Sequence, residues 1–410
     1  MRDPIINSLL DLDLYKFTQA LHACHYFPEA EVHYDFVNRT KVNLANFIDL
    51  DELQEQLAHV RTLSLSKAEK GYLQGLPFFE SRPDFIKALE KPELPPVRSY
   101  GDEEGKLGIS VEGPWFPTIL WETIILSIVN ELYYRSIVVD RGLDLARLHA
   151  VGFNNIADKV AFFKANPILL SMIIEFGTRR RFSQYWQRVA LQTYLEDAPG
   201  FLIGTSNVKL AMDLGIKPIG TMAHELFQFY AAYHREDLVN SQQLALNDWW
   251  DLYGDKLAVG LTDTYGSKFY FDQVFPDIAD KYVGHRHDSG CPHDWTRLLI
   301  DACYKADVDP KELRAIYSDG LNPQKMLEIA EAWDNDTNVL FGWGTTCTND
   351  LGLKPISIVV KMTGVKKGGV WIPTVKLSDN MNKAIGPKSE IDHYKIVFEH
   401  NHNDREDCIV

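Results

Sequence analysis

The sequence lacks the features that would place the chain in a membrane, in a disulfide scaffold or on nucleic acid. No apolar run approaches the roughly 20 residues of a membrane-spanning helix, and the amino terminus has acids where a secretory signal has an unbroken apolar core. Five cysteines are scattered without a CxxC pair. A net charge of −15 argues against a general phosphate-backbone surface. We therefore expect a cytoplasmic protein without membrane or nucleic-acid partners.

Metal-ligand spacings are also weak. Two His/Cys groups lack the matching second half of a zinc site, namely His22, Cys24 and His25, and His285, His287 and Cys291. His224 and Glu225 resemble the start of HExxH, but Gln228 stands where the second histidine is needed. This excludes a zinc protease of that type.

The composition is that of a protein with a large core. The 410 residues are 45% hydrophobic, and this length suits roughly two to three domains. Nine tryptophans contribute to an aromatic content of 12%. We expect these rings to fill the core and domain interfaces rather than to stack on bases.

Seven motifs rich in Gly, Asp, Thr and Arg occur in series. They are EFGTRRRF (175–182), GTSN (204–207), GTMAHE (220–225), LTDTYG (261–266), HRHDSG (285–290), YSDG (317–320) and FGWGTT (341–346). Any one could be an ordinary turn or helix cap. Seven in series favour a single site assembled from many loops.

Short apolar runs precede these motifs and predict buried parallel strands. The clearest runs are 201–203, 257–261, 313–316 and 339–341, and the predicted helices between the motifs are 207–214, 225–234, 291–306 and 322–333. Repeated strand, turn and helix units predict a parallel barrel or sheet. In such barrels the catalytic groups gather at the carboxyl ends of the strands, where the unusual residues of this chain fall.

Local positive charge and glycine indicate a phosphate site. Arg179, Arg180 and Arg181 stand in the predicted first turn of a helix, where the helix dipole is already positive. Pairing with surface carboxylates would explain them structurally, whereas an anion site would use them to hold phosphate. In FGWGTT, two glycines allow close backbone approach and two threonines add hydroxyl donors.

Three acids at predicted strand ends are candidate ligands for ribose hydroxyls or magnesium. They are Asp263, Asp288 and Asp319, and each could instead cap a helix. Asp288 is the most site-like, because Arg286 is two residues away and a helix is predicted from about Pro292.

The chain resembles the bacterial nicotinate phosphoribosyltransferases over nearly its whole length. The resemblance begins at LDLYKFT, includes EGPWFPTILWE, and continues through the motifs named above. It implies an α/β fold, with an irregular (β/α) barrel of the type II phosphoribosyltransferase kind and a second α/β domain built from both chain ends. The implied reaction joins nicotinate and phosphoribosyl pyrophosphate into nicotinate mononucleotide and pyrophosphate, coupled to ATP hydrolysis, in NAD salvage. A homodimer is implied too.

Domain limits follow from the barrel motifs and from predicted strands beyond the last one. We expect a flanking domain at 1–135, completed by 355–410 with strands at 355–360 and 370–377, and a barrel domain at 136–354. GDEEGK (101–106) is expected to be a turn between strands, and 400–410 a loose tail.

The resemblance also implies roles for individual residues. His224 matches the histidine that ATP phosphorylates, although alone it would be read as a core or capping histidine. Phe176 and Arg286 match the pair that sandwiches the pyridine ring, Arg179 a substrate-binding arginine, and Tyr15 an aromatic residue that reaches the partner subunit's site. The positions implied around ribose, phosphates and Mg²⁺ are Asp263, Asp288, Asp319, Gly320, Gly344 and Thr345, with the metal at Asp263 and Asp288.

Ser206 is the residue that favours nicotinate as the ring substrate. Related nicotinamide-using enzymes carry an acid at this place, which would accept hydrogen bonds from a carboxamide but repel a carboxylate. A serine hydroxyl can donate to the carboxylate instead. The sequence departs from the family at Cys291, where an aspartate is usual, and at Trp343, which is bulky and is expected to narrow the glycine loop; Asp294 could replace the missing acid, or the change is a tolerated one at a helix start.

The reaction needs clamps more than a strong base, since the pyridine nitrogen is already a nucleophile. Arginines, backbone amides and magnesium can neutralise the leaving pyrophosphate. Three alternatives remain: a nicotinamide or quinolinate phosphoribosyltransferase, a phosphosugar aldolase or isomerase, and a non-enzymatic phosphoribosyl-ligand sensor. The second would need a Schiff-base lysine or a glutamate base at a strand end, and neither is evident.

Overall fold

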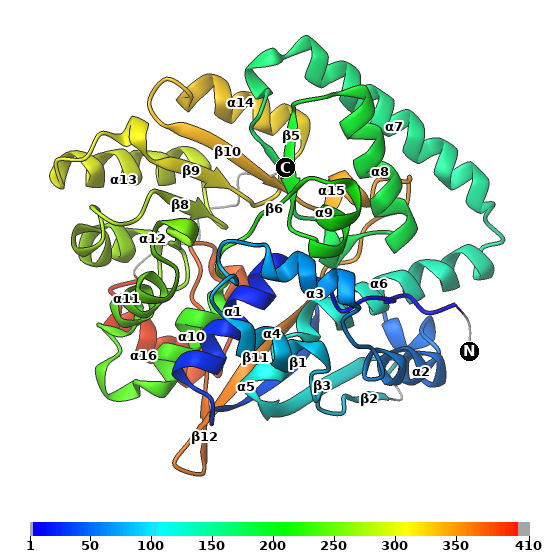
Figure 1. Cartoon of the computed structure of the whole chain (residues 1–410), viewed down its shortest axis with the longest axis horizontal. Helices are drawn as coiled ribbons and strands as arrows, with labels where there is room; N and C mark the ends of the chain where they lie inside the picture. The colour runs from blue at the N-terminus through cyan, green and yellow to red at the C-terminus, as the bar shows by residue number, and fades with distance from the viewer. Residues whose placement is uncertain (1–2, 103, 401–410) are drawn as a thin grey trace. The chain divides into compact units, whose positions relative to one another are not determined.

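A computed structural model describes residues 3–102 and 104–400 (Figure 1). The chain divides into two compact units, one of Met1–Gly220 with Trp343–Lys361 and the other of Thr221–Gly342 with Met362–Val410. The domain limits expected above, 1–135 with 355–410 and 136–354, stay a prediction. Of the expected loose tail, 401–410 lies outside the described residues, whereas His400 is buried.

The first unit begins with helices and an antiparallel sheet region. Its elements up to the barrel strands are α1 (Leu14–Tyr26), β1 (Glu31–Asn38), α2 (Leu50–Val60), α3 (Lys67–Gln74), α4 (Pro83–Glu90), β2 (Arg98–Gly101), β3 (Leu107–Pro114), α5 (Trp115–Thr118), α6 (Trp121–Asp140) and α7 (Leu145–Ala165). β3 pairs antiparallel with both β1 and β2, which confirms the turn expected at 101–106. α6 is buried along most of its length because apolar residues occur all around it.

One sheet combines strands from both ends of the sequence. Its order is β12-β11-β1-β3-β2, where β11 is Ile358–Lys367 and β12 is Val370–Pro373. This confirms a second α/β domain built from both chain ends. The strand expected at 370–377 is too long, however: β12 ends at Pro373, and beyond Thr374, whose N–H still donates to the Thr363 carbonyl, the chain turns away and the Leu377 N–H donates to the Thr264 carbonyl.

The other sheet contains the predicted barrel strands, in the order β6-β5-β4-β10-β9-β8-β7. In the first unit these are β4 (Ile173–Glu175), β5 (Leu202–Thr205) and β6 (Lys217–Pro218), with helices α8 (Gln184–Asp197), α9 (Val208–Leu214) and α15 (Thr345–Thr348). The pairings β4 with β5 and β5 with β6 are parallel.

The second unit continues the same pattern. Its elements are α10 (His224–Tyr233), α11 (Ser241–Tyr253), β7 (Val259–Leu261), α12 (Ser267–Phe269), β8 (Gly284–His287), α13 (Pro292–Lys305), β9 (Arg314–Tyr317), α14 (Pro323–Trp333), β10 (Asn338–Trp343) and α16 (Lys388–Val397). Strands β7 to β10 pair in parallel, with α13 and α14 as crossover helices (Figure 1). The strands and helices predicted between the motifs are therefore confirmed within a few residues, and the architecture is an irregular, open (β/α) barrel.

The arginine block is an exception to the predicted helices. Thr178–Arg180 forms a single 3-10 turn, and α8 begins only at Gln184, where the Ser183 hydroxyl caps it by accepting from the Trp186 N–H. The expectation that Arg179 to Arg181 occupy a first helical turn is wrong, because a capping serine defines the helix start three residues later.

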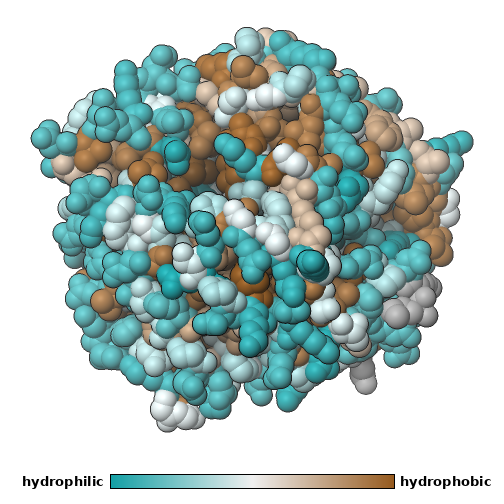
Figure 2. Space-filling model, viewed as in Figure 1, coloured by the Kyte–Doolittle hydropathy of each residue, from teal (hydrophilic) through white to brown (hydrophobic). Residues whose placement is uncertain are grey.

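Core and surface follow the composition. Five tryptophans are fully buried, which confirms that aromatic rings fill the interior: Trp115, Trp121, Trp186, Trp249 and Trp343. The viewed face is largely hydrophilic, with apolar atoms gathered in a few places (Figure 2). Among the helices that the structure describes, none is long and apolar enough to span a bilayer.

Candidate functional site

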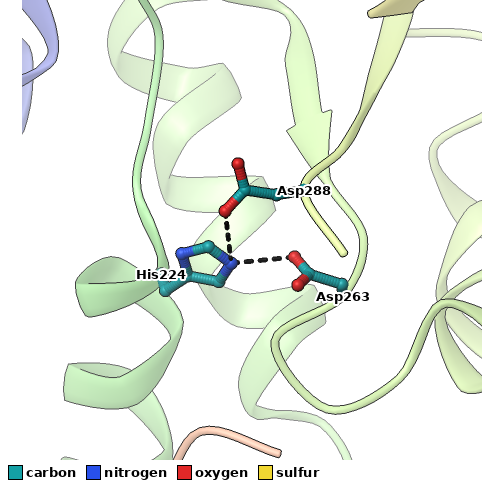
Figure 3. A group of neighbouring side chains, drawn as sticks. All are labelled: His224, Asp263 and Asp288. Carbon is teal, nitrogen blue, oxygen red and sulfur yellow. Dashed lines mark hydrogen bonds and ion pairs between the residues drawn. The ribbon is translucent and has the colours of Figure 1, made fainter. Parts of the chain in front are cut away.

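His224, Asp263 and Asp288 meet in the second unit (Figure 3). His224 is the first residue of α10, while Asp263 and Asp288 follow the ends of β7 and β8. The His224 Nε2 lies 2.8 Å from Asp263 Oδ1 and 3.6 Å from Asp288 Oδ2. Parallel strands bring their carboxyl ends to one edge of a sheet, so two acids distant in sequence reach the same imidazole.

Asp263 is a buried carboxylate with several partners. Its Oδ2 accepts a hydrogen bond of 2.5 Å from the Ser289 hydroxyl and lies 3.3 Å from the Lys376 ammonium. Burial alone would raise the pKa of Asp263, but Lys376 and His224 outweigh it and hold that pKa well below its usual value. Asp263 is therefore ionised and acts as the hydrogen-bond acceptor for His224.

His224 is neutral at physiological pH. Burial, followed by the nearby Lys376 charge, lowers the pKa of His224 to about 4 against the opposing effect of Asp263 and Asp288. A neutral imidazole that faces an ionised carboxylate through Nε2 carries its proton on Nε2. The lone pair is then on Nδ1, which leaves this nitrogen able to act as a nucleophile.

Asp288 is the more open of the two acids. Its Oδ1 accepts a 2.8 Å hydrogen bond from the Ser318 hydroxyl, and its side chain is 29% exposed. Burial opposes ionisation, but Arg286 and His224 hold the pKa of Asp288 below its usual range. A partly exposed, ionised carboxylate at a strand end can bind a cation or a hydroxyl of a ligand.

The segment after β12 supplies functional groups that the sequence analysis missed. Residues 375–378 leave the sheet, and the Leu377 N–H donates to the Thr264 carbonyl. This places Lys376 beside Asp263, Ser378 beside Ser289 and Lys383 2.7 Å from Asp319. Burial and the Asp263 charge raise the pKa of Asp379 to about 7. The sequence signal that could have indicated Lys376 is its place between two apolar residues, Val375 and Leu377, in a predicted strand.

Asp319 and Gly320 lie at the next strand end. Both follow β9, and Gly320 has a φ of +56°, a left-handed conformation that suits glycine. The ion pair with Lys383 leaves Asp319 partly exposed. Thus four predicted positions, Asp263, Asp288, Asp319 and Gly320, fall at consecutive strand ends of one unit.

A second group of predicted residues gathers in the first unit. The Ser206 hydroxyl donates to Asp13 Oδ1 at 2.6 Å, and the Tyr15 hydroxyl donates to Glu122 at 3.4 Å. Arg179 lies 3.3 Å from Glu122, and its guanidinium carbon is 5.9 Å from the centre of the Tyr15 ring. Tyr15, Arg179 and Ser206 are thus connected through Asp13 and Glu122, two acids that the sequence analysis did not single out.

Buried charge balances this group. Lys16 is fully buried and pairs with Glu122 at 2.5 Å, and Lys361 lies 3.9 Å from the same carboxylate. Burial would raise the pKa of Glu122, but Lys16, Lys361 and Arg179 lower it to about 2. Burial, only partly opposed by Arg179, raises the pKa of Asp13. The motif LDLYK (12–16) could have indicated Asp13 and Lys16, since it places an acid and a lysine among the apolar residues at the start of a helix.

The remaining predicted residues are divided between the units. Phe176 follows β4 and is only partly buried, and its N–H donates to the Trp343 carbonyl. Gly344 and Thr345 follow β10 in the first unit, where Lys159 binds the Thr346 carbonyl at 2.6 Å. Arg286, the last of the predicted site residues, lies on β8 in the second unit. The expected ring sandwich of Phe176 and Arg286 stays a prediction.

Two expectations about the phosphate motifs are corrected by the structure. Arg181 is fully buried in an ion pair with Asp11, so three guanidiniums do not form one open anion site. Trp343 does not narrow the glycine loop, because its ring packs in the core near Phe163 and Tyr194. Trp343 therefore stands between the two glycines because its ring fills the core.

Cys291 directly precedes α13 and makes no side-chain cap. Asp294, which could have replaced the missing acid, is exposed and pairs with Arg297 at 2.7 Å on the same helix. This arrangement agrees with a tolerated substitution at a helix start.

The donor set can hold Mg²⁺ at Asp288. Within residues 3–102 and 104–400, the metal-compatible group is His224, Asp263 and Asp288, whose ligand atoms lie within 4.8 Å of one another. Mg²⁺ prefers oxygen ligands and completes its shell with water and substrate phosphates. Asp288 meets this requirement, whereas Asp263 already holds His224, Ser289 and Lys376.

Glu175 gives a prediction for stability. It accepts hydrogen bonds from the Gly177 N–H and Gln187, and its other oxygen accepts from Thr205. Burial raises the pKa of Glu175 to about 7. Between about pH 4.5 and 7 the folded state therefore binds more protons than the unfolded state, so stability falls as pH rises through this range.

Glu175→Gln should abolish this contribution, because the amide retains hydrogen bonding but cannot ionise. We expect the wild-type unfolding midpoint to fall relative to that of the variant between pH 5 and 8. Glu196→Gln, on the exposed face of α8, is the control and should follow the wild type. Parallel curves for wild type and Glu175→Gln would contradict the prediction.

Comparison with known proteins agrees with the geometry. The strand order, the crossover helices and the polar strand ends define an α/β barrel protein of the type II phosphoribosyltransferase kind. The sequence model of the nicotinate phosphoribosyltransferase (NAPRTase) family matches residues 171–402, and that of the family's N-terminal domain matches 10–130. The chain belongs to the nicotinate phosphoribosyltransferase family.

Individual relatives cover nearly the whole chain. It is 39% identical over 390 residues to the nicotinate phosphoribosyltransferase of Cupriavidus necator, covering 93% of this chain and 95% of the relative. For the enzyme of Serratia proteamaculans the identity is 36%, with 93% of each chain covered. The crystal structure of the Vibrio cholerae nicotinate phosphoribosyltransferase aligns with a TM-score of 0.89 at 31% identity, over 98% of this chain and 96% of that one.

Proposed function

We propose that this protein transfers the phosphoribosyl group of phosphoribosyl pyrophosphate to nicotinate, giving nicotinate mononucleotide and pyrophosphate, with ATP hydrolysis coupled through a phosphohistidine at His224. The family membership supports the transfer reaction. The observation that carries the coupling is the neutral His224, held through Nε2 by the ionised Asp263.

Phosphorylation would use the Nδ1 lone pair of His224. A bond forms between Nδ1 and the γ-phosphorus of ATP, and the bond from that phosphorus to the bridging oxygen of ADP breaks. Water later attacks the phosphorus, the bond to Nδ1 breaks and phosphate leaves, which restores His224 and completes ATP hydrolysis. The imidazole gains positive charge, which Asp263 is placed to stabilise. His224 also starts α10, where the helix dipole favours the arriving anion.

Transfer itself would depend on positioning and charge. Nicotinate attacks the anomeric carbon through its ring nitrogen as pyrophosphate leaves, so no residue has to remove a proton from the ring. Good positioning can supply roughly 7 to 11 kcal/mol of the barrier. In this proposal Phe176 and Arg286 hold the ring, Arg179 binds the substrate, and Asp319, Gly320, Gly344 and Thr345 surround ribose and phosphates.

Mg²⁺ bound with the substrates would neutralise phosphate charge. Asp288 would hold it, and Asp263 would contribute mainly by orienting His224. We further propose a cytoplasmic homodimer in which Tyr15 reaches the partner subunit's site. The family resemblance supports these two points.

Ser206 gives a prediction for ring specificity. Its hydroxyl donates to Asp13 in this structure and can rotate toward a substrate carboxylate. Ser206→Asp would place a second carboxylate beside Asp13, which disfavours an anionic ring substrate. We expect kcat/KM for nicotinate to fall at least about tenfold, or 1.4 kcal/mol.

The matched control is Ser206→Ala, which removes the donor without adding charge and should lose less activity. Steady-state assays with nicotinate and nicotinamide provide the comparison. Equal retention of nicotinate activity in Ser206→Asp and wild type would count against this role.

The proposed reaction is tested by measuring pyrophosphate and ADP released by the wild-type protein. The mixture contains phosphoribosyl pyrophosphate, Mg²⁺ and ATP, with nicotinate, nicotinamide or quinolinate in parallel. Both products with nicotinate alone are expected. Pyrophosphate without ADP would refute the coupling, and neither product with any ring acid or amide would refute the proposed function.

A further inference from the structure

Asp11 and Arg181 form a buried ion pair in the first unit, which also contains Tyr15, Phe176 and Ser206. Arg181 is 0% exposed, and its two terminal nitrogens donate to the two oxygens of Asp11 at 2.6 and 2.8 Å. This fork geometry is the strongest form of the Arg–carboxylate interaction. Because both side chains are buried, neither is available to contact a substrate directly.

Asp11 connects this pair to the Ser206 turn. Its Oδ1 also accepts a 2.7 Å hydrogen bond from the Asn207 side chain, and Asn207 caps α9. The backbone is joined at the same place: the Leu14 N–H donates to the Ser206 carbonyl, and the Val208 N–H donates to the Leu12 carbonyl. The segment that carries Asp13 and Tyr15 is thus attached to the turn that carries Ser206.

Arg181 connects the pair to the end of β4. Its Nη1 donates to the Gln187 side-chain oxygen at 3.1 Å, and the Gln187 amide donates to Glu175 at 3.0 Å. Glu175 immediately precedes Phe176 and also accepts from Thr205 in the GTSN turn. One polar network therefore reaches all three segments that carry Tyr15, Phe176 and Ser206.

We propose that Asp11 and Arg181 are positioning residues, whose ion pair fixes these three segments and thereby sets the affinity for the ring substrate. The proposal deepens the proposed function and rests on it for the identity of that substrate. An ion pair is not needed for stability at a site of this kind, since apolar residues of similar volume are often equally stable when buried. Its value here is directional: the two charged hydrogen bonds of the pair, together with Asn207 on Asp11 and Gln187 on Arg181, orient both side chains.

The main test is the charge-free double variant Asp11→Leu/Arg181→Met. Removing Arg181 alone would leave a buried, unpaired carboxylate and could prevent folding, whereas the double variant removes both charges. We expect its KM for nicotinate to rise at least tenfold. ATP-dependent phosphorylation of His224, which belongs to the other unit, should change less than twofold.

Amide hydrogen exchange supplies a readout that does not depend on the reaction. In the double variant, residues 10–15 and 204–209 should exchange at least tenfold faster than in wild type. The matched control is Arg188→Met, which removes a more exposed ion pair between α8 and α9 of the same unit and leaves Asp213 paired with Lys209; it should alter neither KM nor exchange. Arg181→Lys retains the charge without the fork and should show an intermediate KM.

The outcomes separate the two proposals. Nicotinate KM within twofold of wild type, or unchanged exchange at 10–15 and 204–209, would overturn the positioning role. A fall in kcat with unchanged KM would indicate a merely structural role and would also overturn it. Absence of nicotinate mononucleotide from the wild-type reaction would refute the proposed function instead, and faster exchange in the double variant would still support the positioning role.

Discussion

His224→Ala should abolish ATP-dependent labelling of the protein and the stimulation of transfer by ATP. The substitution removes the Nδ1 nucleophile that Asp263 orients through Nε2. If phosphorylation improves substrate affinity about a hundredfold, the loss in kcat/KM corresponds to about 2.7 kcal/mol, which one or two charge-assisted contacts can supply. Incorporation of label from ATP labelled at its γ-phosphate measures the first effect. Pyrophosphate release with and without ATP measures the second.

His224→Gln is the sharper variant, because its amide can still donate to Asp263 while no phosphoryl acceptor remains. It should be as inactive in labelling as the alanine variant but closer to wild type in stability. His234→Asn, near the other end of α10, is the matched control and should be labelled normally. Full ATP-stimulated activity in either His224 variant would eliminate the phosphohistidine proposal.

The barrel strands were predictable from local sequence because they are short and buried. The run 201–203 corresponds to β5, and 313–316 corresponds to β9, each followed by a polar turn and a helix. The boundaries of other elements were less predictable: Ser183 caps α8 and delays its start, and β12 ends at Pro373. The division into two units depends on contacts between segments that are distant in sequence. Neither the hydrophobic periodicity nor the composition of the sequence predicts such contacts.

The site was predictable where a functional side chain follows a strand. His224, Asp263 and Asp288 meet as expected, since strand order forces successive ends to one edge of the sheet. Lys376 was missed because it is 113 positions after Asp263 (376 − 263) and reaches it only after the chain leaves β12. Arg181 was misassigned because sequence does not reveal that Asp11 accompanies it in the interior.

Lys376→Met should have the second large effect. Lys376 is almost fully buried, 3.3 Å from Asp263, and it contributes to the low pKa values of Asp263 and His224. Phosphorylation would bring about two negative charges to His224, by analogy with other phosphorylated residues. Without Lys376 these charges would face two carboxylates, so labelling of His224 should fall at least tenfold.

Stability should fall too, because the variant leaves a buried carboxylate without its cation. Loss of one partner of a buried pair costs about 3 to 5 kcal/mol, and the lower figure applies here since His224 and Ser289 still bind Asp263. Unfolding midpoints measure this effect separately from labelling. Lys268→Met is the control, since Lys268 is 64% exposed in a pair that contributes little.

Lys376→Arg separates charge from packing. It retains the positive charge beside Asp263 and should recover part of the labelling that Lys376→Met loses, even if the longer side chain costs stability. If Lys376→Met were labelled as fast as wild type, the cation would serve only to hold Asp263 in the fold. If both variants lost labelling equally, the ammonium itself, with three donors directed by a flexible stem, would be required rather than charge alone.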